Sequence, residues 1–481
     1  MLGLVFLAFI GFVLALGVKR PFLWVMLYVY IDILAPQRIG FGLIQSLQIS
    51  LVAFAAAFGG YLMLDKKEYV SFSFRQGLMI ALLLYCFWTT GNADFPEDAA
   101  TKWNWVWKAL LFAIFLPFTL TSRARIEALA FMMVMAIGTI VIATGMKIIL
   151  GGGGYGNLHF FVNDNSGIYE SSTLATVAIA LTPLIWWFTR YGTIYRPHWM
   201  VTGFAVALIF ACLLIPIGTE ARTGLVCIAA LGVLLLRYTR RRMLFITGAA
   251  VLGLSALPFL PQTYYDRMAT IFEPDGDESA STRMAVWGWT LDYVAEKPQG
   301  GGFDAFRGNS FTYRLPKRES TGNTSSVEYV EVTDEGRAYH SSVFEVLGEQ
   351  GYPGLAIWAL LHLTGLWQMG WIRTRWLKRD RAGENGEDEE WIAPMATALQ
   401  LASCVYIVGA LFQGIAYQPV MLMIIGLQIG LNSYCKKIDS ARADAASGAQ
   451  SDARSGKQRG SRGADRDETG RRRRPSDAVT A

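Results

Sequence analysis

The sequence predicts an all-α polytopic membrane protein with about 12–13 transmembrane helices and one large outer loop containing short helices. Two observations predict this fold class. Of the 481 residues, 53% are hydrophobic and only 17% are charged, where a soluble protein has about 25% charged residues. The apolar residues also gather into stretches close to the roughly 20 residues that cross a bilayer as a helix. The 15 Trp, 20 Tyr and 28 Phe exclude a chain that is disordered over most of its length.

Thirteen apolar stretches follow one another along the chain, ten before a long polar interval and three after it. They are Leu2–Gly17, Pro21–Leu34, Phe41–Leu64, Gln76–Gly91, Trp103–Leu120, Ala128–Leu150, Thr173–Thr189, Trp199–Gly218, Gly224–Leu236, Met243–Leu260, Pro353–Trp371, Trp391–Gly414 and Pro419–Tyr434. The first two are short and lie close together, so twelve spans remain an alternative. No small-residue cleavage site follows the first stretch, and we therefore expect a retained helix rather than a signal peptide.

Basic residues divide the loops into two alternating sets, which predicts the orientation of the chain. One set holds 18 of the 43 Lys and Arg residues: Lys19, Arg20, Lys66, Lys67, Arg75, Arg123, Arg125, Arg190, Arg196, Arg237, Arg240–Arg242, Arg373, Arg375, Lys378, Arg379 and Arg381. We expect this set in the cytoplasm, together with the C-terminal tail. The other set should face outward: Pro36–Gly40, Asn92–Lys102, Gly151–Ser172, Thr219–Arg222 and Pro261–Ser342. With thirteen helices the N-terminus is also outside, and with twelve it is inside.

The net charge of +5 resides in the tail. Residues 436–481 hold 12 basic and 7 acidic residues, which leaves 31 of each in the rest of the chain. Because the tail has almost no apolar residues, we predict that it is disordered and faces anionic lipid headgroups rather than nucleic acid. The sequence thus divides into an N-terminal transmembrane region (1–150), a second transmembrane region (151–435) that includes the outer loop (261–342), and the tail. The five cysteines lie in or beside apolar stretches, and neither disulfides nor a cysteine metal site is predicted.

The outer loop is the one soluble segment long enough to build a site, and with 8 basic and 13 acidic residues it is net acidic. Residues 281–294 read as a short amphipathic helix, capped by Ser279 or Ser281. One apolar face of this helix is Met284, Trp287, Leu291 and Val294. Arg283 would lie in its first turn, where it and the helix N-terminus can converge on one phosphate. A solvated surface arginine is an equally good interpretation.

Two further polar groups are candidates for a site. Glu220 and Arg222 stand at the outer mouth of two apolar helices, where charges either snorkel to the interface or mark a ligand site. His340 is the only histidine of the outer loop, and its imidazole can move a proton near neutral pH. A lone loop histidine is nevertheless more often polar surface.

Three weaker motifs carry little weight. Asp275 and Asp277 resemble an acidic Mg²⁺ cluster, but they lie in an outward loop without sugar nucleotides. The glycine run at Gly151–Gly154 lacks the Lys and Ser/Thr of a P-loop. Ser341 lacks the context of a hydrolase nucleophile. We therefore expect no metal and no other cofactor.

The order and spacing of several motifs resemble the O-antigen ligase / polymerase family of bacterial inner-membrane proteins. The motifs are Glu220-x-Arg222-x-Gly224, Arg283-x-x-x-Trp287, Pro298-x-Gly300-x-Gly302-Phe303, and His340 followed by Glu345, Glu349, Gly351 and Pro353-Gly354-Leu355. Lys19-Arg20-Pro21, Lys108 and the polar residues Asn163 and Asp164 are closest to the exosortase-associated putative O-glycosylation ligases. Residues 167–170 depart from the pattern of that group. The resemblance covers roughly residues 2–434.

The resemblance implies a transfer of a glycan from an undecaprenyl diphosphate carrier to an acceptor on the periplasmic face of the inner membrane. The acceptor is a lipid, a protein or a polysaccharide. The catalytic residues implied are His340, Arg222 and Arg283. Residues implied to bind the diphosphate or glycan are Arg267, Glu220, Trp287, Lys108 and Glu349. Arginine suits this chemistry because its guanidinium matches phosphate oxygens bidentately and stabilises the charge of the leaving diphosphate.

Three other functions stay open. A repeat-unit polymerase of the same family differs only in its acceptor. A transporter or flippase predicts ionisable residues in mid-helix, for which Lys147 and His362 are the few candidates. A multi-span glycosyltransferase with an acidic residue in its first outer loop is disfavoured, because the loop at Pro36–Gly40 has none.

Overall fold

A computed structural model describes residues 2–36, 44, 47–67, 71–150, 167–239, 241–259, 265, 278–321 and 324–470. Its long helices are α1 (Leu2–Gly17), α2 (Phe22–Leu34), α5 (Ile49–Met63), α6 (Phe74–Gly91), α7 (Pro96–Thr119), α8 (Arg123–Leu150), α9 (Ser171–Tyr191), α10 (Trp199–Gly218), α11 (Arg222–Leu236), α12 (Arg242–Ala256), α14 (Glu278–Glu296), α15 (Ser342–Arg381), α16 (Ile392–Ala410) and α17 (Pro419–Gly470). Two strands, β1 (Ser310–Thr321) and β2 (Thr324–Glu335), form one antiparallel hairpin.

The predicted all-α polytopic membrane fold is confirmed. Each of the thirteen apolar stretches overlaps one helix, and α14 is the additional helix of the outer loop. Among the described residues, α8, α9, α10, α15 and α16 are long and apolar enough to cross a membrane, and α1, α2, α5, α11 and α12 are apolar but shorter. The chain is therefore a multi-pass membrane protein.

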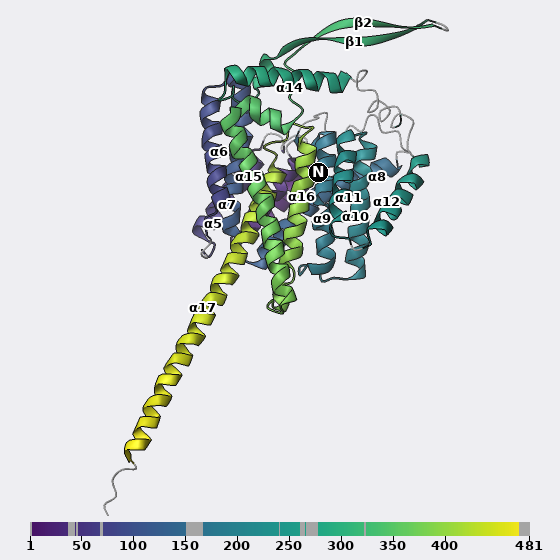
Figure 1. Ribbon diagram of the computed structural model, residues 1–481. Coiled ribbons are helices and arrows are strands. Elements are labelled where there is room, and N and C mark those ends of the chain that lie inside the picture. Colours follow the sequence, from purple (N-terminus) through teal and green to yellow (C-terminus); the bar gives the residue numbers. More distant parts are fainter. Residues whose placement is uncertain are drawn as a thin grey trace, which may run out of the picture.

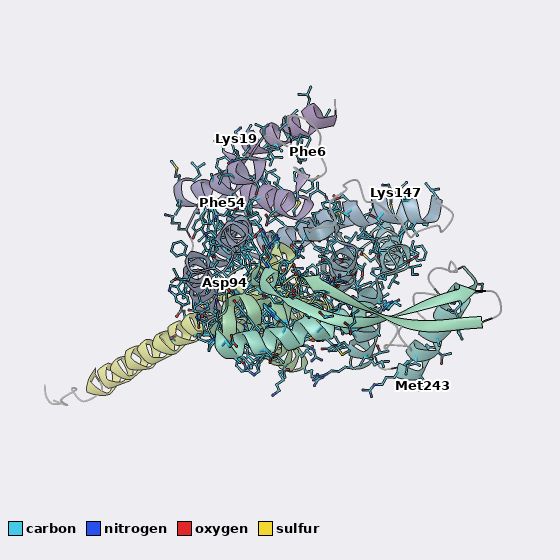
Figure 2. All side chains as sticks on the ribbon, turned by 90° about the horizontal axis from the view of Figure 1, so that it is seen from above. Phe6, Lys19, Phe54, Asp94, Lys147 and Met243 are labelled. Carbon is cyan, nitrogen blue, oxygen red and sulfur yellow. The ribbon has the colours of Figure 1, made fainter. Side chains whose placement is uncertain are left out.

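The helices form one bundle (Figure 1), and among the described spans α9 is the most deeply buried in it. Its residues from Leu174 to Leu181 are almost fully buried, and it packs against α8, α10, α11 and α16. Further along α9, the indole of Trp187 donates to the carbonyl of Trp391 and meets its ring edge-on. Seen from above, α1 with Phe6, and Lys19 just after it, lie at one edge of the bundle, and α12 with Met243 lies at the opposite edge (Figure 2).

Residues of the predicted basic loops form ion pairs and a cation–π contact at one end of the bundle. Arg125 pairs with Asp65, and the Arg373 guanidinium lies over the Tyr238 ring. Arg379 pairs with Asp439 at the start of the tail. Arg75, which we expected in a loop, is instead buried in the first turn of α6, where it donates to Gln428. The outer-loop helix α14 lies across the other end, and α17 projects from the basic end (Figure 1).

The tail begins as a continuation of the last helix of the bundle. Helix α17 continues from its apolar part to Gly470, and residues 471–481 lie outside the described part. No proline interrupts residues 436–470, and alanine, arginine and lysine are good helix formers, so the helix extends without an apolar face. Its first turns beyond the bundle are tethered, because Arg442 forms an ion pair with Glu389, and Asp439 forms ion pairs with Arg375 and Arg379.

Helix α14 begins earlier than predicted, and its packed face is a different one. It starts at Glu278, so the serines expected to cap it lie within it and Arg283 is its sixth residue rather than part of its first turn. The predicted face is wrong, since Met284 and Leu291 are 61% and 50% exposed. The buried stripe is instead Thr282, Val286, Thr290 and Val294. An apolar periodicity does not detect this stripe, because two of its four residues are threonines. Thr290 can be buried because its hydroxyl donates to the Val286 carbonyl of the same helix.

The hairpin is the second feature of the outer loop that the sequence analysis missed. Strands β1 and β2 pair over twelve residues each, with Ser310 opposite Glu335. We expected only short helices there, because charged and hydroxyl residues interrupt the alternation that marks a half-buried strand. The hairpin extends over the end of the bundle beside α14 (Figure 1).

Candidate functional site

A cavity of about 790 Å³ opens at the end of the bundle that carries α14. Side chains from α2, α5, α7, α9, α14 and α15 line it, together with the loop between α16 and α17. Its volume is within the range of small-molecule sites. Elements from both halves of the sequence therefore converge on one hollow.

The structure brings four of the eight predicted site residues to this cavity: Lys108, Arg283, His340 and Glu349. Trp287 stands beside it and supports the His340 segment, because its indole donates to the Tyr339 carbonyl at 2.9 Å. Glu220 and Arg222 are not among the cavity-lining residues. Arg267 lies outside the described residues.

His340 is held in a left-handed backbone conformation, with φ of 47°. A non-glycine residue in this region costs about 1–3 kcal/mol and persists only where its surroundings impose it. The surroundings do so here: Asn309 bonds both the amide and the carbonyl of Arg337 at 2.9 and 2.7 Å. On the other side, the Trp287 ring stacks on Phe344 with centroids 4.8 Å apart.

The pKa of His340 is lowered from its ordinary value of 6.5. Burial is the largest cause, and the charges of Arg283 and Arg337 add to it, while Glu170 opposes it. The imidazole is therefore neutral at pH 7 and can accept a proton. The sequence-based expectation of a proton-transfer group fits this environment.

Lys102 is the centre of a buried ion cluster that the sequence analysis did not identify. Its Nζ lies 2.7 Å from Glu345 and 2.6 Å from Glu349, and 3.7 Å from Asp304. The Glu349 side chain is fully buried and also accepts the Asp304 amide at 3.0 Å. Glu349 was predicted to bind substrate, but its first oxygen is already engaged with the protein. The cluster ties α7 to the start of α15, two residues after His340.

Glu345 extends this cluster to the α16–α17 loop. Its second carboxylate oxygen accepts the Ala416 amide at 3.0 Å, and the neighbouring Ser342 hydroxyl donates to the Gln413 carbonyl at 2.8 Å. Gln413 in turn donates to the Thr176 hydroxyl on α9. Hydrogen bonds therefore join three parts of the chain that line the cavity: the start of α15, the α16–α17 loop and α9.

Close packing requires glycine at two positions of the motifs. Gly300 and Gly351 both have positive φ, 82° and 61°, which side chains rarely adopt. A Cβ on Gly300 would lie 2.5 Å from the Glu349 carbonyl, and one on Gly351 would lie 2.0 Å from the Pro298 carbonyl. The two segments interlock through hydrogen bonds such as Tyr352 N to Pro298 O at 2.9 Å. This contact holds the kink of α15 that positions Glu349.

Helix α9 presents its N-terminus to the same cavity. Glu170 caps it, accepting the amides of Ser172 and Thr173 at 3.1 and 2.6 Å. Residues 167–170 are where the sequence departs from the exosortase-associated pattern. Their structural role is now clear, because a capping carboxylate fills the N-terminal anion position of α9.

Arg222 begins α11, whose first turns pack beside the N-terminal part of α9. Five residues further along α11, Cys227 contacts the Thr176 hydroxyl at 3.7 Å, which accepts from the cavity residue Gln413. Gly224 of the same motif allows close packing, since a Cβ there would meet Pro216 at 2.6 Å. The role of Glu220 and Arg222 toward a substrate therefore stays a prediction.

A sequence signal for Lys102 exists in retrospect. Because α7 starts at Pro96 rather than Trp103, Lys102, Trp105 and Lys108 follow one another at three-residue spacing along one side of a helix. We placed Lys102 at the end of an outer loop, and so only Lys108 was considered. Asp304 and Glu170 had no such signal, since both belong to irregular backbone.

Comparison with known proteins assigns two regions of the chain. The sequence profile of a family of unknown function (DUF5935) matches residues 1–193, and the profile described as O-Antigen ligase matches residues 206–359. No curated protein matches the chain significantly. The second match covers Arg283, His340 and Glu349, and it brings the function class of glycan-transferring ligases and polymerases. Residues 206–359 therefore match the O-antigen ligase family, and this match supports assigning the chain to it.

Proposed function

We propose that the protein transfers a glycan from an undecaprenyl diphosphate carrier to an acceptor on the periplasmic face of the bacterial inner membrane. The observation that carries the proposal is the cavity in which Arg283 and His340 meet. It opens at the end of the bundle opposite the basic loops, and basic loops favour the cytoplasmic side. The donor's lipid chain can then remain in the bilayer beside the bundle while its headgroup enters the cavity.

The reaction requires one proton acceptor and one anion site. The acceptor hydroxyl attacks the anomeric carbon, the bond from that carbon to the diphosphate oxygen breaks, and the lipid diphosphate leaves with the electron pair. Neutral His340 takes the hydroxyl proton. Arg283 faces the leaving diphosphate, whose oxygens match its guanidinium.

The other predicted residues have supporting parts in this proposal. Arg222 and Arg267 supply further cations for the diphosphate, and Glu220 orients Arg222. Trp287 holds the backbone of the catalytic histidine through Tyr339. No metal or other cofactor is needed, because the energy is stored in the glycosyl diphosphate bond.

A deletion strain tests this function. Without the protein, lipid-linked glycan should accumulate in the membrane because its transfer is blocked. Chromatography of the extracted lipid-linked pool distinguishes the two members of the family. Full-length polymer indicates a ligase, and single repeat units indicate a polymerase. An unchanged pool in the deletion strain contradicts glycan transfer altogether.

The orientation is testable by itself. Alkaline phosphatase is active only outside the cytoplasm, so we expect a fusion at Asn309 to be active and a fusion at Gly383 to be inactive. The two sites lie at opposite ends of the bundle, at the base of the hairpin and just after α15. The reverse pattern would invert the proposed topology and place the cavity in the cytoplasm.

A further inference from the structure

One wall of the cavity comes from the region that matches a family of unknown function. Asp32 of α2, Ser50 of α5, and Trp105 and Lys108 of α7 all belong to residues 1–193 and line the cavity. The reaction proposed above uses none of Asp32, Ser50 and Trp105. The proposed reaction therefore leaves this wall of the cavity without a ligand.

Asp32 and Lys108 are charged groups that the protein does not neutralise through direct pairing. The Asp32 Oδ2 is buried and accepts no hydrogen bond from the described residues. Lys108 acts on it electrostatically, but the two form no ion pair within 4 Å in the described part of the chain. The Tyr28 hydroxyl, one helical turn before Asp32, interacts with the same carboxylate. The Asp32 Oδ2 can therefore accept a hydrogen bond from a ligand in the cavity that Asp32 lines.

Different charges act most strongly on His340 and on Asp32. The charges that act on His340 are those of Arg283, Arg337 and Glu170, whereas the charge that acts on Asp32 is that of Lys108. The Lys102 cluster, with its three carboxylates, lines the same cavity. A diphosphate is therefore favoured beside Arg283, and it is disfavoured beside the carboxylates, including Asp32.

The chemistry at the Asp32 end matches a saccharide. Sugar hydroxyls both donate and accept hydrogen bonds, so they satisfy a carboxylate, an ammonium group and a serine hydroxyl together. Trp105, 39% exposed, offers an aromatic surface of the kind that lines small-molecule pockets beside a few polar groups.

We propose that Asp32, Ser50, Trp105 and Lys108 form a saccharide subsite, so that the N-terminal region of unknown function recognises glycan while the O-antigen ligase region holds the diphosphate. This inference rests on the proposed function, in which the substrate is a glycan. It assigns Asp32 and Trp105 as specificity residues that touch the sugar and not the reacting bond.

Two probes separate the subsites in the full-length protein in detergent. One is the phosphate-free oligosaccharide released by mild acid from the lipid-linked pool of the producing strain, and the other is inorganic diphosphate. Asp32→Asn and Trp105→Ala should each weaken oligosaccharide binding at least tenfold, with the affinity for diphosphate changed less than twofold. Arg283→Ala should do the reverse. Binding is measured by microscale thermophoresis on protein that elutes as a single peak.

Matched variants control for charge and ring loss. Glu97→Gln makes the same charge change as Asp32→Asn, on the exposed first turn of α7, and Trp88→Ala removes an exposed ring of α6. Both should leave both affinities unchanged. Unweakened oligosaccharide binding in both Asp32→Asn and Trp105→Ala overturns the saccharide subsite, even if diphosphate binding behaves as expected. Unweakened diphosphate binding in Arg283→Ala overturns the proposed function instead.

A kinetic measurement identifies which saccharide the subsite holds. Release of lipid diphosphate with water as acceptor depends on the donor alone. A raised KM for the lipid-linked donor in Asp32→Asn supports binding of the donor glycan. An unchanged KM with transfer lost supports binding of an acceptor glycan. Unchanged donor KM and unchanged transfer together contradict the inference.

Discussion

Replacing His340 by glutamine should lower the rate of glycan transfer by about 10²–10⁴-fold, the usual contribution of a general base. Glutamine keeps a polar side chain of similar reach but cannot accept the proton of the acceptor hydroxyl. The membrane fold should be retained, because the partly exposed His340 side chain lines the cavity rather than the packed core. Transfer is measured with lipid-linked glycan in reconstituted vesicles.

The pH profile identifies His340 as the group that titrates. Only the neutral imidazole accepts a proton, and its pKa is lowered, so activity should fall on the acid side at a pH below 6.5. Arg283 is one cause of the lowering. Arg283→Gln should therefore move the acid limb of its residual activity to higher pH. An acid limb that stays in place in this variant contradicts the assignment of the limb to His340.

The matched control is His198→Gln. His198 caps α10 at the other end of the bundle, where its Nδ1 accepts the Met200 amide. This variant should keep transfer within about twofold and show the wild-type acid limb, since it is remote from the cavity. If His198→Gln and His340→Gln retain the same activity, His340 has no part in the chemistry.

Replacing Lys102 by methionine should produce the largest loss of stability at this end of the bundle. It removes the cation from three carboxylates, of which Glu349 is fully buried and Glu345 nearly so. Breaking a buried pair by removing one partner costs about 3–5 kcal/mol, because the other charge stays buried. Transfer should be lost as well, since the start of α15 and the His340 segment lose their link to α7. Thermal unfolding in detergent and the transfer assay measure the two effects.

A lysine at the same end of the bundle provides the control. Lys297 pairs with Asp94, but its side chain is 42% exposed, and such surface pairs contribute about 0–1 kcal/mol. Lys297→Met should therefore leave the midpoint of unfolding almost unchanged. Adding Glu345→Gln and Glu349→Gln to Lys102→Met should recover part of the lost stability, because no buried charge is then unpaired. A stable Lys102→Met protein would show that the carboxylates are not ionised around the lysine.

The outer loop shows why prediction from sequence reached the helices more easily than the site. Apolar length identified the spans, because a helix in a bilayer must bury its backbone hydrogen bonds within itself whatever its neighbours are. In α14, by contrast, an exposed methionine and leucine outweighed the two threonines of the packed stripe. Which face packs depends on α15, which comes later in the chain and is no part of the local pattern.

The sequence by itself determined the all-α membrane fold, the two sets of loops and the candidates His340, Arg283 and Lys108, because bilayer thickness, charge asymmetry and residue chemistry act locally. Only the tertiary structure decided that Lys102 rather than a solvated loop neutralises Glu345 and Glu349. It also decided that α2 and α7 complete a cavity begun by α14 and α15. The physical reason is that an ion pair or a cavity depends on the distance between segments that lie hundreds of residues apart in the sequence. Tertiary packing sets that distance, and no local stretch of sequence contains it.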